Sequence, residues 1–229
     1  MSLKESKSLQ FNEIIWEVSL LGEQVILLKC PKQTPIEKIH ESTHVIEREL
    51  GQRLVDIVPA YHSIAVFTTI PLEELIDLLQ KAQIKPSNNS SEKEHIELPI
   101  CYELGLDIEL VALKKGLKVE ELIAIHLAGK YRISFIGFTP GFIYADGLDE
   151  TLSCSRLENP RKKVLAGSVG IGGGQTGIYS LDSPGGWNII GLTPVKLFDP
   201  VKQPPMMIDV GSSYNFYRIT QEEFESWGS

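Results

Sequence analysis

The chain has 229 residues, enough for one large domain or two modest ones, each with its own core. Hydrophobic residues make up 42% and charged residues 23%, which is typical of a soluble globular protein. The net charge of −8 argues against a nucleic-acid partner, because neutralising phosphates requires a basic face. Because no run of about 18 apolar residues and no signal-peptide pattern occurs, we expect a cytoplasmic protein with no membrane partner.

Residues 1–90 are predicted to form an α+β domain. The polar residues 1–9 are expected to be frayed. Period-two alternation predicts strands, and 3.6-residue periodicity predicts helices. The strands are expected at 13–20, 24–29, 53–58 and 63–69, and the helices at 35–50 and 71–82. At the first helix, Thr34 and Glu37 match a capping box, and Gly51 can end the helix.

A polar segment at residues 85–95 separates this domain from a second one at 91–229. A strand is expected at 96–101, followed by a helix that Asp107 caps and Gly116 ends, and then by a helix at 119–128. The remainder reads as short strands and turns, typical of a β-rich barrel or sandwich. In this part of the chain we expect strands at 133–138, 164–171, 189–198 and 207–219.

Glycine is concentrated in residues 131–194, which hold 12 of the 19 glycines. Each glycine inside regular structure costs about 0.5–1 kcal/mol, so repeated glycines need a compensating reason. The turns GFTPGF, GIGGGQTG and SPGGW separate aromatic and β-branched residues. We interpret the stretch as a pocket or docking face shaped by the backbone.

Several sequence blocks in the second half resemble one family, named for the B subunit of 5-oxoprolinase, for KipI or for allophanate hydrolase subunit 1. The blocks are HLAGKYRISFIGF, GFTPGFIY, GLDETL, NPRKKVLAGSVGIGGGQTGIY, SPGGWNIIGLTP and LFDP. The resemblance implies an N-terminal α+β domain followed by a cyclophilin-like β-barrel. Three positions depart from the family's pattern: Leu165 replaces a proline, Leu192 a commonly basic residue, and Cys154-Ser155 a Thr-Pro pair.

The resemblance also implies a function, as the B subunit of a heteromeric ATP-dependent 5-oxoprolinase that opens 5-oxo-L-proline to L-glutamate. ATP is then a co-substrate of the complex, and the chain is inactive or weak alone. The implied partners are a C-type subunit, similar to allophanate hydrolase subunit 2, and an A-type subunit. A different hypothesis is an inhibitor that binds a sporulation sensor histidine kinase, as one branch of the family does. Prolyl isomerisation is a third, resting only on barrel analogy.

His126 is the best candidate for a catalytic base, because histidine titrates near neutral pH. It lies between Ile125 and Leu127 on a predicted helix, so a structural role is at least as plausible. Arg161 is the natural partner for a carboxylate or phosphate, since its planar fork donates two hydrogen bonds. Ser168 offers a hydroxyl contact.

The segment from Gly172 to Gly177 lacks the Gly-Lys-Ser/Thr of a P-loop, but its N–H groups could form an anion-binding nest. The alternative is a tight strand connection that needs positive φ. Candidate substrate or nucleotide contacts in and after this segment are Gly173, Gly174, Gln175, Thr176, Tyr179 and Trp187. Gln175 and Thr176 could instead cap the turn, and the two aromatic residues could simply fill the barrel.

Phe138, Pro140 and Phe142 could form an apolar edge for partner docking. The three cysteines, Cys30, Cys101 and Cys154, are far apart and have no histidine at ligand spacing. We therefore predict free thiols, with no disulfide framework and no metal site.

Overall fold

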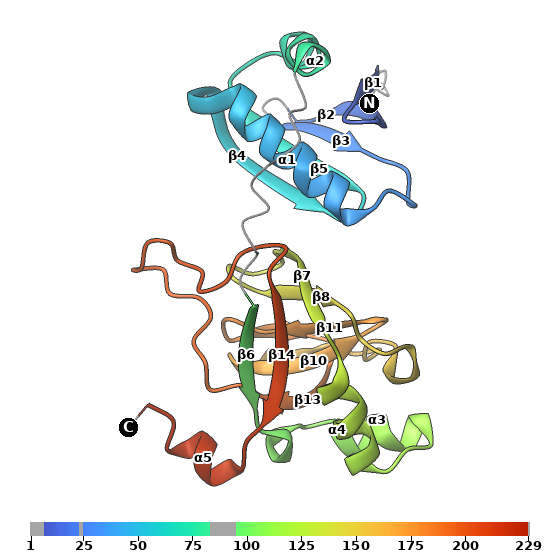
Figure 1. Ribbon diagram of the computed structural model, residues 1–229, viewed down its shortest axis with the longest axis vertical. Helices are drawn as coiled ribbons and strands as arrows, with labels where there is room; N and C mark the ends of the chain where they lie inside the picture. The colour runs from blue at the N-terminus through green and yellow to red at the C-terminus, as the bar shows by residue number, and fades with distance from the viewer. Residues whose placement is uncertain (1–6, 23–24, 83–94, 229) are drawn as a thin grey trace. The chain divides into compact units, whose positions relative to one another are not determined.

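The computed structural model describes residues 7–22, 25–82 and 95–228, and the chain divides into two compact units (Figure 1). The units are Met1–Ser91 and Glu92–Ser229. Most of the expected linker, residues 85–94, lies outside the described residues.

The first unit is an antiparallel five-stranded sheet with two helices, in the strand order β1-β2-β3-β5-β4. The strands are β1 (Lys7–Phe11), β2 (Ile14–Leu21), β3 (Val25–Lys29), β4 (Leu54–Ala60) and β5 (Ser63–Thr68). The helices are α1 (Ile36–Leu50) and α2 (Leu72–Lys81), with the short 3-10 helix η1 (Gly51–Arg53) after α1. Alternate residues of β2 and β5, such as Trp16 and Val66, are buried together with one stripe of each helix.

Two local expectations for this unit are wrong. Of residues 1–9, which were expected to be frayed, residues 7–9 instead belong to β1, because Leu9 and Phe11 are buried while the strand pairs with β2; residues 1–6 lie outside the described residues. Thr34 does not cap α1: the N-cap is Pro35, and no side chain caps the helix. The other end of α1 is as predicted, since Gly51 has φ +51°.

The second unit contains a curled seven-stranded sheet, with α3 and α4 at one end of it (Figure 1). Its sheet strands are β6 (His95–Ile100), β7 (Tyr131–Ile136), β8 (Ile143–Asp146), β10 (Ser168–Gly172), β11 (Gln175–Ile178), β13 (Asn188–Leu192) and β14 (Ser213–Arg218). A two-stranded sheet pairs β9 (Arg161–Val164) with β12 (Ser183–Gly185). The helices are η2 (Tyr102–Leu104), α3 (Ile108–Lys115), α4 (Val119–Ala128), η3 (Glu150–Leu152) and α5 (Gln221–Glu225).

The two edges of the seven-stranded sheet meet at one point. The strand order is β13-β10-β11-β8-β7-β14-β6, so β13 and β6 are the edge strands. Directly after β6, Cys101 forms an antiparallel bridge with Leu192 of β13 through N–H···O bonds of 2.8 and 3.0 Å. Gly191 permits this approach, because a Cβ there would lie 2.8 Å from the Ile100 side chain. The sheet is therefore a curled layer joined to itself at one end.

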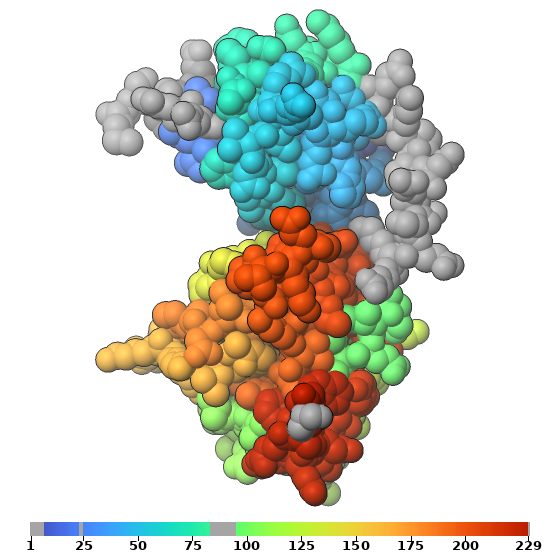
Figure 2. All heavy atoms as spheres, turned by 90° about the vertical axis from the view of Figure 1, so that its left-hand side faces the viewer, coloured from blue at the N-terminus to red at the C-terminus, as the bar shows by residue number. Residues whose placement is uncertain are grey.

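The single strand expected at 164–171 is wrong, because the structure divides it between two sheets. Val164 ends β9 and Ser168 begins β10, with Gly167 between them at φ +85°. A Cβ at Gly167 would also lie 2.4 Å from the Thr193 carbonyl oxygen, so this turn requires glycine. The strands expected at 189–198 and 207–219 are shorter than predicted. The segment between β13 and β14 is largely irregular and lies on the surface of the second unit (Figure 2).

Candidate functional site

His126 lies in the core of the second unit, with no exposed surface. Its Nδ1 is 2.7 Å from the Tyr102 hydroxyl, and its ring stacks on Phe216 with the centroids 5.1 Å apart. Tyr131 donates a hydrogen bond to the His126 carbonyl oxygen. Burial lowers the pKa of His126 to about 3, so the ring is neutral at physiological pH. This environment favours the structural alternative over a catalytic base.

Gly173 and Gly174 form the two-residue turn between β10 and β11, since Gly172 pairs with Gln175. Gly173 has φ +69° and Gly174 does not have positive φ, as a type II′ hairpin turn requires. The Gly173 N–H donates to the Cys154 carbonyl oxygen at 2.8 Å, so it is not free for an anion. The glycine segment therefore matches the tight strand connection.

Trp187 packs against glycines on one face of the seven-stranded sheet. A Cβ at Gly172 would lie 2.6 Å from the indole, and one at Gly177 would lie 2.9 Å from it. Phe142 also packs edge-on against the Trp187 ring at 5.5 Å. The glycines thus leave room for a buried aromatic side chain.

Most of the other predicted contacts are buried within the second unit. Ser168, Thr176, Tyr179 and Trp187 are at most 4% exposed. Thr176 Oγ1 donates to the Gly170 carbonyl oxygen and is 3.5 Å from His126 Nε2. These four side chains do not reach the surface of the chain, whereas Gly173, Gly174 and Gln175 are at least partly exposed. For these three residues, ligand contact stays a prediction.

Arg161 joins two distant parts of the second unit. Its Nη2 donates to Asp107 Oδ1, while Asp107 Oδ2 accepts a 2.6 Å hydrogen bond from the Ile189 N–H. Asp107 precedes α3, but its side chain does not cap the helix as expected. Because Asp107 is buried and Arg161 is only partly exposed, this ion pair has a clear structural role.

The loop between β7 and β8 presents Phe138 to solvent. The Phe138 side chain is 64% exposed, and its backbone has φ +69°. The Thr139 N–H donates to the Gly137 carbonyl oxygen at 2.9 Å, which makes Phe138 the central residue of a strained γ-turn. Pro140 is exposed beside it, whereas Phe142 is fully buried and packs edge-on against Phe138. Of the predicted docking edge, Phe138 and Pro140 are therefore accessible.

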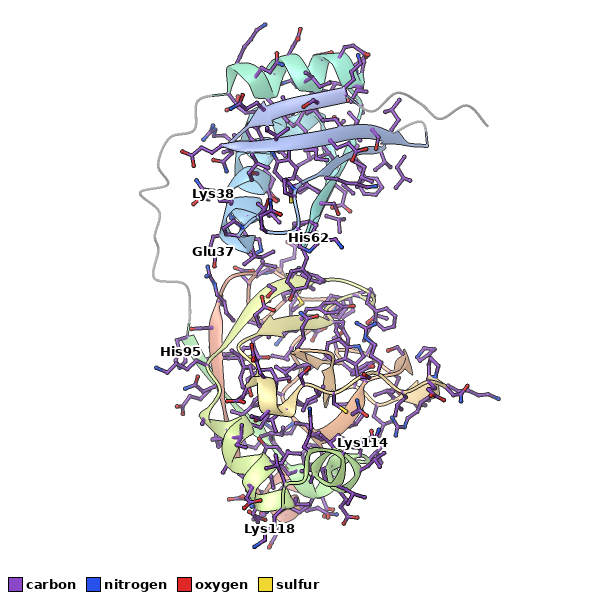
Figure 3. The ribbon with its side chains drawn as sticks, turned by 90° about the vertical axis from the view of Figure 1, so that its right-hand side faces the viewer. Glu37, Lys38, His62, His95, Lys114 and Lys118 are labelled. Atoms are coloured by element: carbon purple, nitrogen blue, oxygen red, sulfur yellow. The ribbon has the colours of Figure 1, made fainter. Side chains whose placement is uncertain are left out.

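A basic recess of about 670 Å³ lies between the end of α3 and residues 153–159. Its cations are Lys114, Lys115 and Arg156, and none has an ion-pair partner among the described residues. Lys114 is labelled on α3 in Figure 3. Helix α4 and strands β7 and β8 separate the two lysines from Arg156 along the chain. Only the tertiary structure brings these cations together.

Among the described residues, no group of three His, Cys, Asp or Glu side chains is placed to hold a metal ion. In the same part of the chain, no helix is both long and apolar enough to cross a membrane.

A family model described as "Carboxyltransferase domain, subdomain C and D" matches residues 16–208. The B subunit of 5-oxoprolinase from Escherichia coli O157:H7 is 38% identical over 89% of this chain and 95% of its own length.

Two solved structures extend the comparison. The conserved uncharacterized protein PH0987 from Pyrococcus horikoshii has 39% identity and a TM-score of 0.56, covering 90% of this chain and 99% of that one. The Kluyveromyces lactis urea carboxylase has a TM-score of 0.71 over 98% of this chain and 23% of its own. At 18% identity, that second likeness concerns the fold alone.

Proposed function

Because the chain belongs to the family of the carboxyltransferase domain, subdomains C and D, we propose that it is the B subunit of a heteromeric ATP-dependent 5-oxoprolinase. The observation that carries this proposal is the 38% identity with the E. coli protein of that name, over nearly all of its length. In this role the chain takes part in opening 5-oxo-L-proline to L-glutamate.

The chemistry explains why several subunits would be needed. An unstrained amide resists attack by water, and phosphorylation of its oxygen by ATP would turn it into a good electrophile. Such a reaction needs a nucleotide site, a lactam site and a group that positions water. In this chain the predicted catalytic base His126 is buried and neutral. We propose that the site is completed by a C-type partner, similar to allophanate hydrolase subunit 2, and by an A-type partner.

The fold proposal is that the second unit is a cyclophilin-like β-barrel. It is supported by the curled seven-stranded sheet and by the Cys101–Leu192 bridge that joins its edges.

We propose Phe138 and Pro140 as the docking edge for the C-type partner. A large apolar side chain that is 64% exposed loses solvent contact on association, which favours binding. The γ-turn holds the ring outward at a backbone cost of about 1–3 kcal/mol, and such strain is concentrated at functional sites. The edge would contribute to assembly rather than to chemistry.

Glutamate release from 5-oxoproline tests the proposal when this chain is mixed with the two partner proteins and ATP. We expect release only when all three proteins and ATP are present. Phe138→Ser should weaken co-purification with the C-type partner, whereas Val201→Ser, at an apolar position that is even more exposed (87%), should not. Release that is independent of this chain would reject the role. Inhibition of histidine-kinase autophosphorylation by the chain, without any glutamate release, would support the kinase-inhibitor alternative instead.

A further inference from the structure

The basic recess is unusual on a chain whose net charge is −8. Lys114 and Lys115 come from the last turn of α3. Arg156 comes from the loop that follows η3, and α4, β7 and β8 lie between the two segments along the chain. Like charges brought together repel one another, so this grouping costs free energy unless an anion offsets it. Positive charges in the last turn of a helix interact favourably with the helix dipole. This explains why lysines occur at the end of α3, but it does not explain why Arg156 lies beside them.

Hydrogen bonds hold the loop that forms one wall of the recess. The Ser153 hydroxyl donates to the Gly173 carbonyl oxygen at 3.1 Å. Asn188 Nδ2 donates to the Ser155 carbonyl oxygen at 2.9 Å, and the Leu157 N–H donates to the Gly186 carbonyl oxygen at 2.7 Å. A wall that is already ordered loses little conformational entropy when a ligand binds.

Arg156 is positioned by the aromatic cluster beneath it. Its guanidinium carbon lies 5.1 Å from the centroid of the Trp187 ring, within the range of a cation–π contact. This contact orients the side chain without neutralising its charge. The planar guanidinium can therefore still donate paired hydrogen bonds to an oxyanion.

The lining indicates what kind of anion fits. Three cations and one carboxylate, Glu158, leave a net charge of +2, more than one monocarboxylate would neutralise. Ser155 and Asn159 add neutral hydrogen-bond donors, and the volume of about 670 Å³ lies within the range of small-molecule sites. Lysine ammonium groups and an arginine fork suit the several oxygens of linked phosphates.

We propose that this recess binds an oligophosphate group, either as the phosphate chain of a nucleotide or as a free oligophosphate. The site differs from the contacts predicted at Arg161 and at the Gly173 turn. It does not rest on the oxoprolinase role, because binding is measured on the full chain without partner proteins.

Isothermal titration of the full chain with ATP and with inorganic tripolyphosphate, at low and high salt, tests the proposal. The variant Lys114→Gln/Lys115→Gln/Arg156→Gln should bind both probes at least about tenfold more weakly, since hydrogen bonds to charged groups are strong. Lys130→Gln/Lys162→Gln/Lys202→Gln changes the net charge equally at exposed positions outside the recess and should bind like the parent chain. Circular dichroism of both variants checks that they fold.

The two probes separate the sources of the phosphate. Equal affinity for both would support recognition of the phosphates alone, and tighter recess-dependent binding of ATP would support an added contact to the nucleoside. No binding of either probe, or equal weakening in both triple variants, would overturn the proposal. Recess-dependent binding of a poly-glutamate peptide in place of either phosphate would also overturn it, in favour of an acidic protein segment.

Discussion

Replacing Gly172 with alanine tests whether the glycines of β10 exist to accommodate Trp187. The new Cβ would lie 2.6, 2.7 and 2.9 Å from three indole carbons, all closer than real Cβ atoms approach. The indole is 4% exposed and packs edge-on against Phe142, so it has little freedom to move away. Overpacking of this kind costs about 1–3 kcal/mol.

The matched control is Gly174→Ala, two residues along the same hairpin. Gly174 has no heavy atom within 4 Å of the added Cβ and no positive φ, so the substitution should be nearly neutral. For a unit of this size, the cost at Gly172 corresponds to a fall in Tm of roughly 4–10 °C by differential scanning calorimetry.

A double-mutant cycle with Trp187→Leu separates the indole clash from any other effect of alanine in the strand. Without the indole, Gly172→Ala should cost at least about 1 kcal/mol less than in the parent chain. Equal costs in both backgrounds, or equal Tm values for the alanine variants at Gly172 and Gly174, would show that the indole does not require glycine at position 172.

Three further predictions concern the rest of the second unit. Asp107→Asn should lower the free energy of unfolding by about 2 kcal/mol, because it breaks the partly buried ion pair with Arg161. The control Asp182→Asn breaks an exposed ion pair with Lys163 and should cost under about 1 kcal/mol. Equal urea midpoints for the two variants would contradict this prediction. Since burial lowers the pKa of His126 from 6.5 to about 3, the stability linked to its neutral ring is complete above pH 6.5 and is lost as the pH falls towards 3. NMR should therefore show a neutral His126 ring at about pH 5, and titration of that ring near 6.5 would oppose it. Phe138→Gly should leave the free energy of unfolding unchanged or raise it by about 1 kcal/mol, because glycine tolerates φ +69°. A fall of more than about 1 kcal/mol in the free energy of unfolding, measured by urea denaturation, would argue against backbone strain at this residue.

The features that the sequence predicted well depend on neighbouring residues. Gly51 and Gly116 end α1 and α3 with positive φ, as their places after periodic apolar runs indicated. The hairpin turn at Gly173 is likewise a local requirement. Such signals need no knowledge of distant parts of the chain.

The features that the sequence did not predict depend on contacts between distant segments. Asp107 looked like a helix cap, but its carboxylate binds Arg161, 54 residues away. Trp187 accounts for Gly172 and Gly177 only once β10, β11 and the residues before β13 are packed together. The basic recess likewise combines the end of α3 with a loop after η3, so its cations do not form a motif along the chain.

The family resemblance and the family model agree, yet the residues predicted as the catalytic base and the ligand contacts are mostly interior side chains. His126 and Thr176 are fully buried, and their type alone could not distinguish a reactive group from a hydrogen-bonded core residue. Exposure separates the candidates: Phe138, in the loop between β7 and β8, and the cations of the recess are accessible.

In the proposed role, this chain is an indispensable part of an ATP-dependent lactam hydrolase. The most direct measurement titrates it into fixed amounts of the two partner proteins with ATP and 5-oxoproline, and follows glutamate. We expect glutamate release to rise from the background and to saturate as the chain is added. A rate that stays flat across the titration, whether at background or already at its maximum, would contradict it.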